Sequence, residues 1–231
     1  MKKKIINFLE KKKMIKKLIS EFEIFFRNMN ISVVGSSANL LGKKLGNKID
    51  NCDLVARFNL APTTKYESDV GAKYDIIVCN HLFFTNSIKR KNKSEISNFK
   101  NKVFIVISDE DEKYALNLNK TKYQYVDKSN RVFIFDNSLN HILRYLIISK
   151  YNFLKKMYYY KYGKKLSSGL IFVSLLKISN IRFKIFGFNL KKKDFLDYYY
   201  QSNKNNTKSN HDFGNENILL NKIFFNELKE Y

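Results

Sequence analysis

Apolar residues along the first part of this chain recur at the spacing of an α-helix. Between residues 2 and 26 they gather on one side of the helical projection, and lysines fill much of the other side. The pattern predicts one long amphipathic helix. Two interpretations of its apolar side stay open. It packs against the rest of the domain, or it rests on an anionic membrane that attracts the lysine clusters 2–4 and 11–13.

Beyond this helix, short apolar runs alternate with segments of helical pattern. Most of the runs are unbroken, as in strands of a sheet that is covered on both faces. Strands alternating with helices indicate a single Rossmann-like α/β domain, with a mainly parallel sheet and helices on both faces. The predicted strands are 31–34, 53–58, 76–79, 103–107 and 183–186, and the predicted helices are 38–45, 138–150, 169–178 and 215–228.

The same pattern divides the chain into a basic N-terminal helix, residues 1–28, and one larger domain, residues 29–231. The polar run 203–210 predicts a loop. No stretch approaches the ~20 apolar residues that a membrane span needs, and the N-terminal pattern is not that of a signal peptide. Two cysteines, Cys52 and Cys79, do not suggest a disulfide framework. We therefore expect a cytoplasmic protein, peripheral at the membrane if the helix rests there.

The net charge is +22, from 43 Lys and Arg against 21 Asp and Glu. A positive field of this size attracts phosphates, anionic lipids or acidic sugars. The strong use of Lys, Asn, Ile, Phe and Tyr is also what an AT-rich genome produces, so the charge by itself names no partner. A nucleic-acid-binding protein is one alternative, but no recognition motif of that class is present.

The stretch that begins at the first predicted strand carries the most specific pattern. An apolar run leads into a Gly-Ser-Ser turn at 35–37, where a backbone can approach a nucleotide closely. From there the chain resembles the long sialylmotif of the animal-type sialyltransferases, which runs Val-Val-Gly-Asn-Ser-Gly-Asn-Leu, Ile-Asp, Asp-Phe-Val, Arg-Met-Asn, Ala-Pro and Asp-Val-Gly. The matching residues are Val33, Val34, Gly35, Ser37, Asn39, Leu40, Ile49, Asp50, Asp53, Val55, Arg57, Asn59, Ala61, Pro62, Asp69, Val70 and Gly71.

Three further motifs of this family appear in the family's order. Residues 166–171 and 185–188 resemble the short sialylmotif, 198–201 fall where the third motif is expected, and 211–216 resemble the very short motif, a His with a Glu five positions later. The resemblance implies an inverting, metal-independent glycosyltransferase without a cofactor. It would move sialic acid, or a related acidic nine-carbon or Kdo-type sugar, from its CMP ester to a glycan hydroxyl.

The resemblance also assigns roles to individual residues. His211 would be the general base, since imidazole titrates near neutrality, and Tyr198 would contact the phosphate or the acceptor. Amides, hydroxyls and the N–H groups of a helix N-terminus suit a nucleotide and its phosphate. For Ser168, a helix N-cap is the plain alternative, and both roles can coexist. The residues expected to bind the CMP-sugar are Ser36, Ser37, Asn39, Asn59, Ser167, Ser168 and Gly169.

This sequence departs from the family pattern at several positions. The two motif cysteines are absent, and with them the disulfide that links them in the family. The other departures are Ser36 in place of the first Asn of the long motif, Leu166 in place of a Pro, and Asp197 or Tyr198 in place of the third-motif His.

The remaining candidate groups have plainer interpretations. The acidic run 108–112 resembles the metal motif of other glycosyltransferases, but we interpret it as a solvated turn because the resembled family needs no metal. His81 and His141 are interpreted as structural or exposed. The expected partners are CMP-sialic acid or a related CMP-sugar and an acceptor on a glycolipid, lipooligosaccharide or polysaccharide, with no nucleic acid. A non-catalytic, membrane-associated relative is the alternative function.

Overall fold

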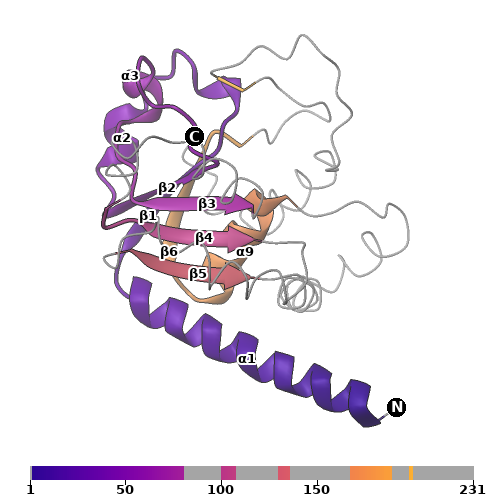
Figure 1. Cartoon of the computed structure of the whole chain (residues 1–231). Helices are drawn as coiled ribbons and strands as arrows, with labels where there is room; N and C mark the ends of the chain where they lie inside the picture. The colour runs from indigo at the N-terminus through magenta and orange to yellow at the C-terminus, as the bar shows by residue number, and fades with distance from the viewer. Residues whose placement is uncertain (1, 81–99, 108–129, 136–166, 189–197, 200–231) are drawn as a thin grey trace, which may run out of the picture.

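The computed structural model describes residues 2–80, 100–107, 130–135, 167–188 and 198–199, and its centre is one parallel sheet (Figure 1). Its six strands lie in the order β5-β4-β3-β2-β1-β6, and every neighbouring pair is parallel. The strands are β1 Asn30–Val34, β2 Leu54–Phe58, β3 Ile76–Asn80, β4 Val103–Ile107, β5 Arg131–Phe135 and β6 Arg182–Phe186.

The strands form where apolar, largely β-branched or aromatic residues run together. All five residues of β4 are buried, which requires cover on both faces of the sheet. The structure confirms the predicted single Rossmann-like α/β domain, and the five predicted strands lie within one residue of the observed bounds. β5 was not predicted.

Helices cover both faces of this sheet. Residues of α9 and of the end of α1 share one core cluster with β1 to β6, and residues of η1, α2 and α3 form a second cluster on the other face. The predicted helices on both faces are therefore confirmed. The helices are α1 Lys2–Phe26, the 3-10 turn η1 Ala38–Leu40, α2 Gly46–Asp50, α3 Glu67–Val70 and α9 Ser168–Ile178.

The helix predicted at 38–45 was wrong. Only the 3-10 turn Ala38–Leu40 forms there, because the backbone then adopts left-handed conformations at Gly42 (φ 74°) and Lys44 (φ 53°). The Asp69 carboxylate accepts the N–H groups of both residues, at 2.9 and 2.8 Å. These two hydrogen bonds also hold the pKa of Asp69 below its usual range. A distant acidic residue thus stabilises a loop where the local pattern favoured a helix.

Several other predictions lie outside the described residues. These are the helices at 138–150 and 215–228, the loop at 203–210, and the surroundings of His81 and His141. The division into 1–28 and 29–231 stays a prediction. Among the described helices, none is long and apolar enough to cross a membrane.

The last turns of α1 belong to the core. Phe22 and Phe26 have no exposed surface, and the Phe22 ring lies 5.3 Å from the Phe133 ring of β5 in an edge-on contact. Glu21 and Arg131 add an ion pair of 3.9 Å beside it, which is exposed and weak. The end of the predicted amphipathic helix therefore packs on the domain.

We predict that Phe22→Ala lowers the free energy of unfolding by about 3–5 kcal/mol, the usual cost of truncating a buried Phe. Ile24→Ala is the matched control in the same helix, because Ile24 is 61% exposed. It should change stability by less than about 0.5 kcal/mol. Urea denaturation of the full chain measures both, and equal losses in the two variants would contradict the docking of α1.

Candidate functional site

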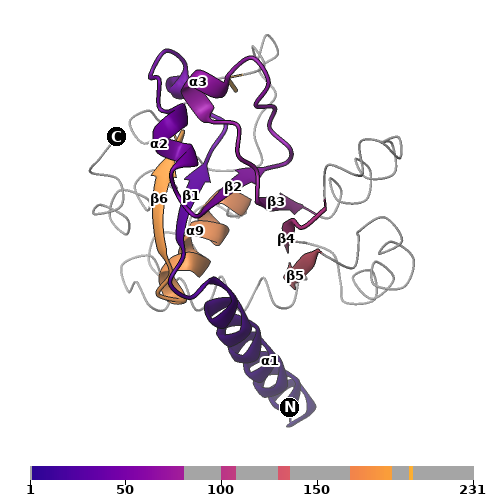
Figure 2. The ribbon, with the colours of Figure 1, turned by 90° about the vertical axis from the view of Figure 1, so that its left-hand side faces the viewer.

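The order of the strands reverses at one place in the sheet. From β1 the chain moves outward through β2, β3 and β4 to β5, and β6 then pairs with the other side of β1. Figure 2 shows β1 and β6 side by side, with α9 against them. In open parallel sheets, ligands bind outside the carboxyl ends of the strands at such a switch point. The residues that follow β1 and β6 are therefore the first candidates.

Two glycines bring the ends of these strands into backbone contact. The Gly35 N–H donates to the Phe186 carbonyl at 2.8 Å, and the Ser37 N–H donates to the Gly187 carbonyl at 3.1 Å. A Cβ on Gly35 would lie 2.4 Å from the Gly187 oxygen, which no side chain tolerates. Gly187 has φ +66°, and a Cβ there would meet Leu40. The turn at 35–37 is thus fixed against the end of β6.

The polar side chains of this turn make structural hydrogen bonds. The Ser37 hydroxyl oxygen accepts the Asn39 N–H at 3.3 Å and caps η1. The exposed Asn39 amide donates to the Phe188 carbonyl at 3.2 Å. Ser36, Ser37 and Asn39 therefore all lie at the switch point. Asn39 has, in addition, a role in joining the turn to the segment after β6.

Asn59 directly follows β2, the neighbour of β1. Asn59 and Leu60 both have positive φ, 49° and 55°, and the Ala61 N–H donates to the Phe58 carbonyl at 3.0 Å. Two left-handed residues closed by this bond form a type I′ turn. Asn adopts such a conformation more easily than most residues, so the turn gives a backbone reason for Asn59 beside any contact with a nucleotide. The side chain is exposed at the carboxyl edge of the sheet.

The N-terminus of α9 lies at the same place. Ser167, not Ser168, is the cap: its hydroxyl oxygen accepts the Leu170 N–H at 3.2 Å. Ser168 and Gly169 follow in the first turn, where helical N–H groups have no partner within the helix and form the positive end of its dipole. A Cβ on Gly169 would lie 3.1 Å from the Phe188 ring, so the helix start lies close to the end of β6.

An aromatic contact links these segments beneath the polar residues. The Phe188 ring lies 5.9 Å from the Phe58 ring in an edge-on contact, and Phe58 makes a similar contact with Phe172 of α9 at 6.3 Å. Phe58 precedes Asn59, so this cluster connects the ends of β2 and β6 with α9. The sequence interpretation did not list Phe188. The feature of the sequence that could have identified Phe188 is its position as the last residue of the motif segment 185–188.

The third motif is attached to the turn by backbone pairing. Ser37 and Tyr198 form an antiparallel bridge, and the Tyr199 N–H donates to the Ser36 carbonyl at 3.0 Å. The Tyr199 hydroxyl donates to the Pro62 carbonyl at 2.6 Å, and its side chain is buried. Burial raises the pKa of Tyr198, so its phenol keeps its proton at neutral pH. Tyr198 thus lies beside the turn at 35–37, and Tyr199, which was not predicted, holds it there.

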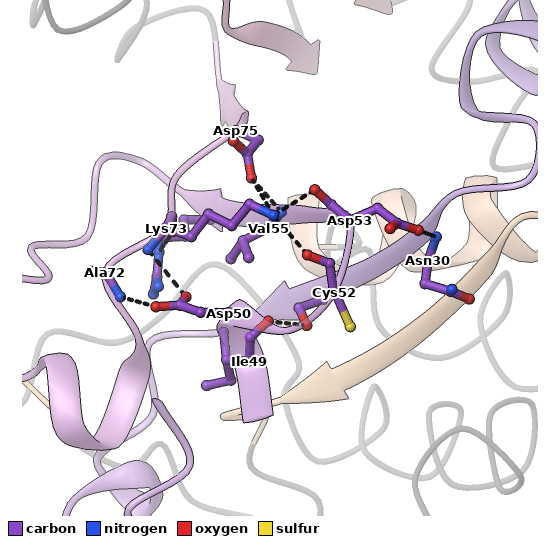
Figure 3. Close-up of polar contacts among 11 residues, drawn as sticks. Asn30, Ile49, Asp50, Cys52, Asp53, Val55, Ala72, Lys73 and Asp75 are labelled. Atoms are coloured by element: carbon purple, nitrogen blue, oxygen red, sulfur yellow. Dashed lines mark hydrogen bonds and ion pairs between the residues drawn. The ribbon is translucent and has the colours of Figure 1, made fainter. Parts of the chain in front are cut away.

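Several acidic motif residues lie at the opposite edge, before the strands begin (Figure 3). The Asp50 carboxylate accepts the N–H groups of Ala72 and Lys73, at 2.7 and 3.1 Å. The Lys73 ammonium in turn donates to the carbonyls of Cys52 and Asp53, at 2.7 and 2.6 Å. These charges satisfy backbone groups that turns leave without partners. Asp50 and Lys73 thus hold the backbone of the segments that lead into β2 and β3.

Arg57 is a fully buried cation of the long motif. Its guanidinium donates to the carbonyls of Val70, Gly71 and Lys73, at 2.7, 3.0 and 2.9 Å. Burial lowers the pKa of Arg57, and the largest opposing influence is Tyr199. Nη1 has no hydrogen-bond partner among the described residues. Arg57 therefore ties the segment after α3 to β2, close to the residue that holds the third motif.

The predicted general base, His211, lies outside the described residues, as do Glu216 and the acidic run 108–112. The described cysteines, Cys52 and Cys79, are free thiols, and burial raises the pKa of Cys79, which makes its thiol unreactive. Among the described His, Cys, Asp and Glu residues, no group of three is placed to hold a metal ion.

A family model matches almost the whole chain. Residues 7–227 match glycosyltransferase family 29 (sialyltransferase). Solved structures with the same fold include a mammalian sialyltransferase in complex with Gal-beta-1-3GalNAc-ortho-nitrophenol. Its TM-score is 0.58 at 18% identity, over 87% of this chain and 67% of that one.

Two curated relatives illustrate the similarity in sequence. Beta-galactoside alpha-2,6-sialyltransferase 2 of Danio rerio is 38% identical over 89 residues, which are 38% of this chain and 16% of the relative. CMP-N-acetylneuraminate-beta-galactosamide-alpha-2,3-sialyltransferase 1 of Gallus gallus is 26% identical over 178 residues, 74% of this chain and 47% of the relative. The chain thus spans less than half of either relative.

We predict that Gly35→Ala destabilises the protein by about 3 kcal/mol or more, the upper range for overpacking, because the added Cβ meets backbone. It should also abolish binding of CMP, the nucleotide that the resemblance implies. Gly42→Ala is the matched control. A Cβ on residue 42 would meet nothing within 4 Å. Because φ is +74° there, Ala should still cost about 1–2 kcal/mol of backbone strain. Thermal denaturation with and without CMP compares them, and undiminished CMP binding by Gly35→Ala would contradict the site.

Proposed function

This chain belongs to glycosyltransferase family 29, the sialyltransferases, and we propose that it transfers sialic acid, or a related acidic nine-carbon or Kdo-type sugar, from its CMP ester to a glycan hydroxyl. One observation supports this most. Segments 35–39, 167–169, 187–188 and 198–199, each from a different part of the chain, meet at the switch point of a parallel sheet. Nucleotides bind in this position in related architectures.

In this proposal the donor lies across the carboxyl ends of β1, β2 and β6. The side chains of Ser36, Ser37, Asn39 and Asn59 bind the nucleoside, since amides and hydroxyls both donate and accept hydrogen bonds. The first turn of α9 holds the phosphate. There the N–H groups of Ser168 and Gly169 and the dipole of an eleven-residue helix favour an anion.

The proposed chemistry is a single displacement with inversion. The acceptor oxygen attacks the anomeric carbon as the bond from that carbon to the phosphate oxygen breaks, and CMP leaves with the electron pair. His211 takes the proton of the acceptor hydroxyl. Tyr198 keeps its phenol proton and donates a hydrogen bond to the phosphate, in place of the His that the third motif lacks. No metal or other cofactor takes part, because the helix N-terminus and the phenol stabilise the leaving phosphate.

The acceptor and the location complete the proposal. The names of the relatives in Danio rerio and Gallus gallus both specify galactose-type acceptors, so we propose a terminal galactose-type sugar on a glycolipid, lipooligosaccharide or polysaccharide. The protein acts in the cytoplasm, peripheral at an anionic membrane surface.

We predict that CMP raises the melting temperature of the protein and that EDTA leaves this shift unchanged, because a ligand that binds only the native state stabilises it. Asn59→Gly should greatly reduce the shift. Glycine adopts the left-handed conformation of residue 59, so this variant keeps the turn and loses only the amide. Differential scanning fluorimetry measures both effects.

The control for this experiment is Asn101→Gly, which removes another amide at positive φ (58°), two residues before β4. It should keep the full CMP shift. A shift that requires manganese or magnesium would contradict the metal-free proposal and favour a metal at Asp109 and Asp111.

We predict that His211→Ala lowers kcat by roughly 10²–10⁴-fold, the usual contribution of a positioned base, with little change in CMP affinity. The wild-type rate should fall below about pH 6.5, where an ordinary imidazole binds a proton, and this limb should be missing in the variant. Measurement of CMP release from CMP-sialic acid, with a galactose-terminated acceptor, gives both quantities.

His81→Ala is the control for loss of a histidine and should keep near-normal turnover. Near-normal turnover in His211→Ala would contradict its role as base. CMP binding without turnover in the wild type, with any donor and acceptor, would indicate a non-catalytic relative instead.

A further inference from the structure

Helix α1 consists of two parts with different surroundings. From Leu18 onward one face of the helix packs on the core, where Phe22 and Phe26 are fully buried and Leu18 and Ile19 are partly buried. Both views show the N-terminal half running away from the sheet and its covering helices (Figures 1 and 2). A helix of 25 residues is about 37 Å long, so the part before Leu18 extends about 24 Å beyond the docked end.

The projecting half is strongly basic. Residues 2–17 contain eight lysines and one acidic residue, Glu10. Lys13, Lys16 and Lys17 are exposed in the structure. Basic residues near an anionic bilayer each contribute about 1 kcal/mol of attraction, so a cluster of this size is sufficient for binding.

The same half also offers apolar residues. Met14 is 53% exposed between the lysines. In the sequence, residues 8 and 15 precede Phe22 by fourteen and seven residues, so the spacing alone predicts that the apolar stripe of the docked part continues into this half. An interfacial helix needs both a basic and an apolar side.

We propose that residues 2–17 of α1 bind the surface of an anionic lipid bilayer, with the helix lying in the interface. This rests on the membrane location proposed above and not on the sugar transfer itself. The apolar positions favour a bilayer over a nucleic acid, which needs only the charge. Residues 18–26 fasten the catalytic domain to the membrane-bound half through the buried phenylalanines, so an acceptor on a membrane lipid is brought within reach.

The first test measures sedimentation of the full chain with vesicles of phosphatidylglycerol and phosphatidylcholine, and with phosphatidylcholine alone. The wild type should bind only the anionic vesicles, and salt should weaken the binding. Replacing Lys13, Lys16 and Lys17 together by Gln should reduce partitioning on the order of a hundredfold. Transfer to a soluble acceptor without vesicles should not change, so loss of membrane binding is distinguishable from failure of the enzymatic proposal.

The matched control removes three exposed lysines from the body, Lys43, Lys65 and Lys100, again by Gln. Its net charge equals that of the α1 variant, and it should keep near-normal vesicle binding. Equal losses in the two variants would overturn the assignment to α1 and indicate attraction by net charge alone.

A second test reports insertion. The chain has no tryptophan, so Met14→Trp introduces a single fluorophore in α1, and Leu41→Trp introduces one at an apolar residue of the body with similar exposure, 44% against 53%. Anionic vesicles should shift the emission of Trp at position 14 to shorter wavelength and leave that at position 41 unchanged. No shift at position 14, or an equal shift with duplex DNA, would overturn the proposal.

Discussion

The close contact between the backbones that follow β1 and β6 is the constraint on which the candidate site depends. Gly35 and Gly187 allow an approach that any side chain would prevent, and the two hydrogen bonds across it fix the turn at 35–37. Ser37 then begins η1, Asn39 reaches the Phe188 carbonyl, and Tyr199 pairs with the Ser36 carbonyl. Without that contact, the polar groups would still be present in the chain but would not lie around one point.

The long motif distributes its residues between two edges of the sheet. Small and polar residues lie at the carboxyl edge, whereas Asp50 and Asp53, with Lys73 beside them, lie at the amino edge and bind backbone groups. Arg57 adds a buried cation whose hydrogen bonds all go to carbonyl groups. A buried charge of this kind is costly to leave without partners, and these carbonyl groups supply them. Asp50, Asp53 and Arg57 of the motif therefore bind backbone groups of the protein itself.

Helix α1 shows how one sequence pattern can serve two environments. Its apolar residues follow a single helical spacing in the sequence, and the described α1 side chains that pack on the core are Leu18, Ile19, Phe22 and Phe26. The two interpretations of the stripe are therefore compatible, since packing is observed for the last turns and membrane contact is proposed for the N-terminal half. The same arrangement links the proposed membrane surface to the core through Phe22 and Phe26, which contact the edge strand β5.

Local sequence determined the parts of this protein that depend on neighbours along the chain. The strands are unbroken apolar runs, α1 follows a helical period, and the motifs named the Ser and Asn residues that the structure brings to the switch point. The alternating, partly exposed run Arg131–Phe135 gave too weak a signal for β5 to be found. Only the tertiary structure decided that 41–45 is a loop, that Ser167 rather than Ser168 caps α9, and that Phe188 and Tyr199 belong to the site. The cap is a local choice between two neighbouring serines, but the other three are fixed by partners far away in the sequence: the Asp69 carboxylate for the loop, Gly35 and Gly169 for Phe188, and Ser36 for Tyr199. Periodicity and propensity describe a residue's own segment, whereas these contacts exist only after the parallel sheet has brought separate segments together.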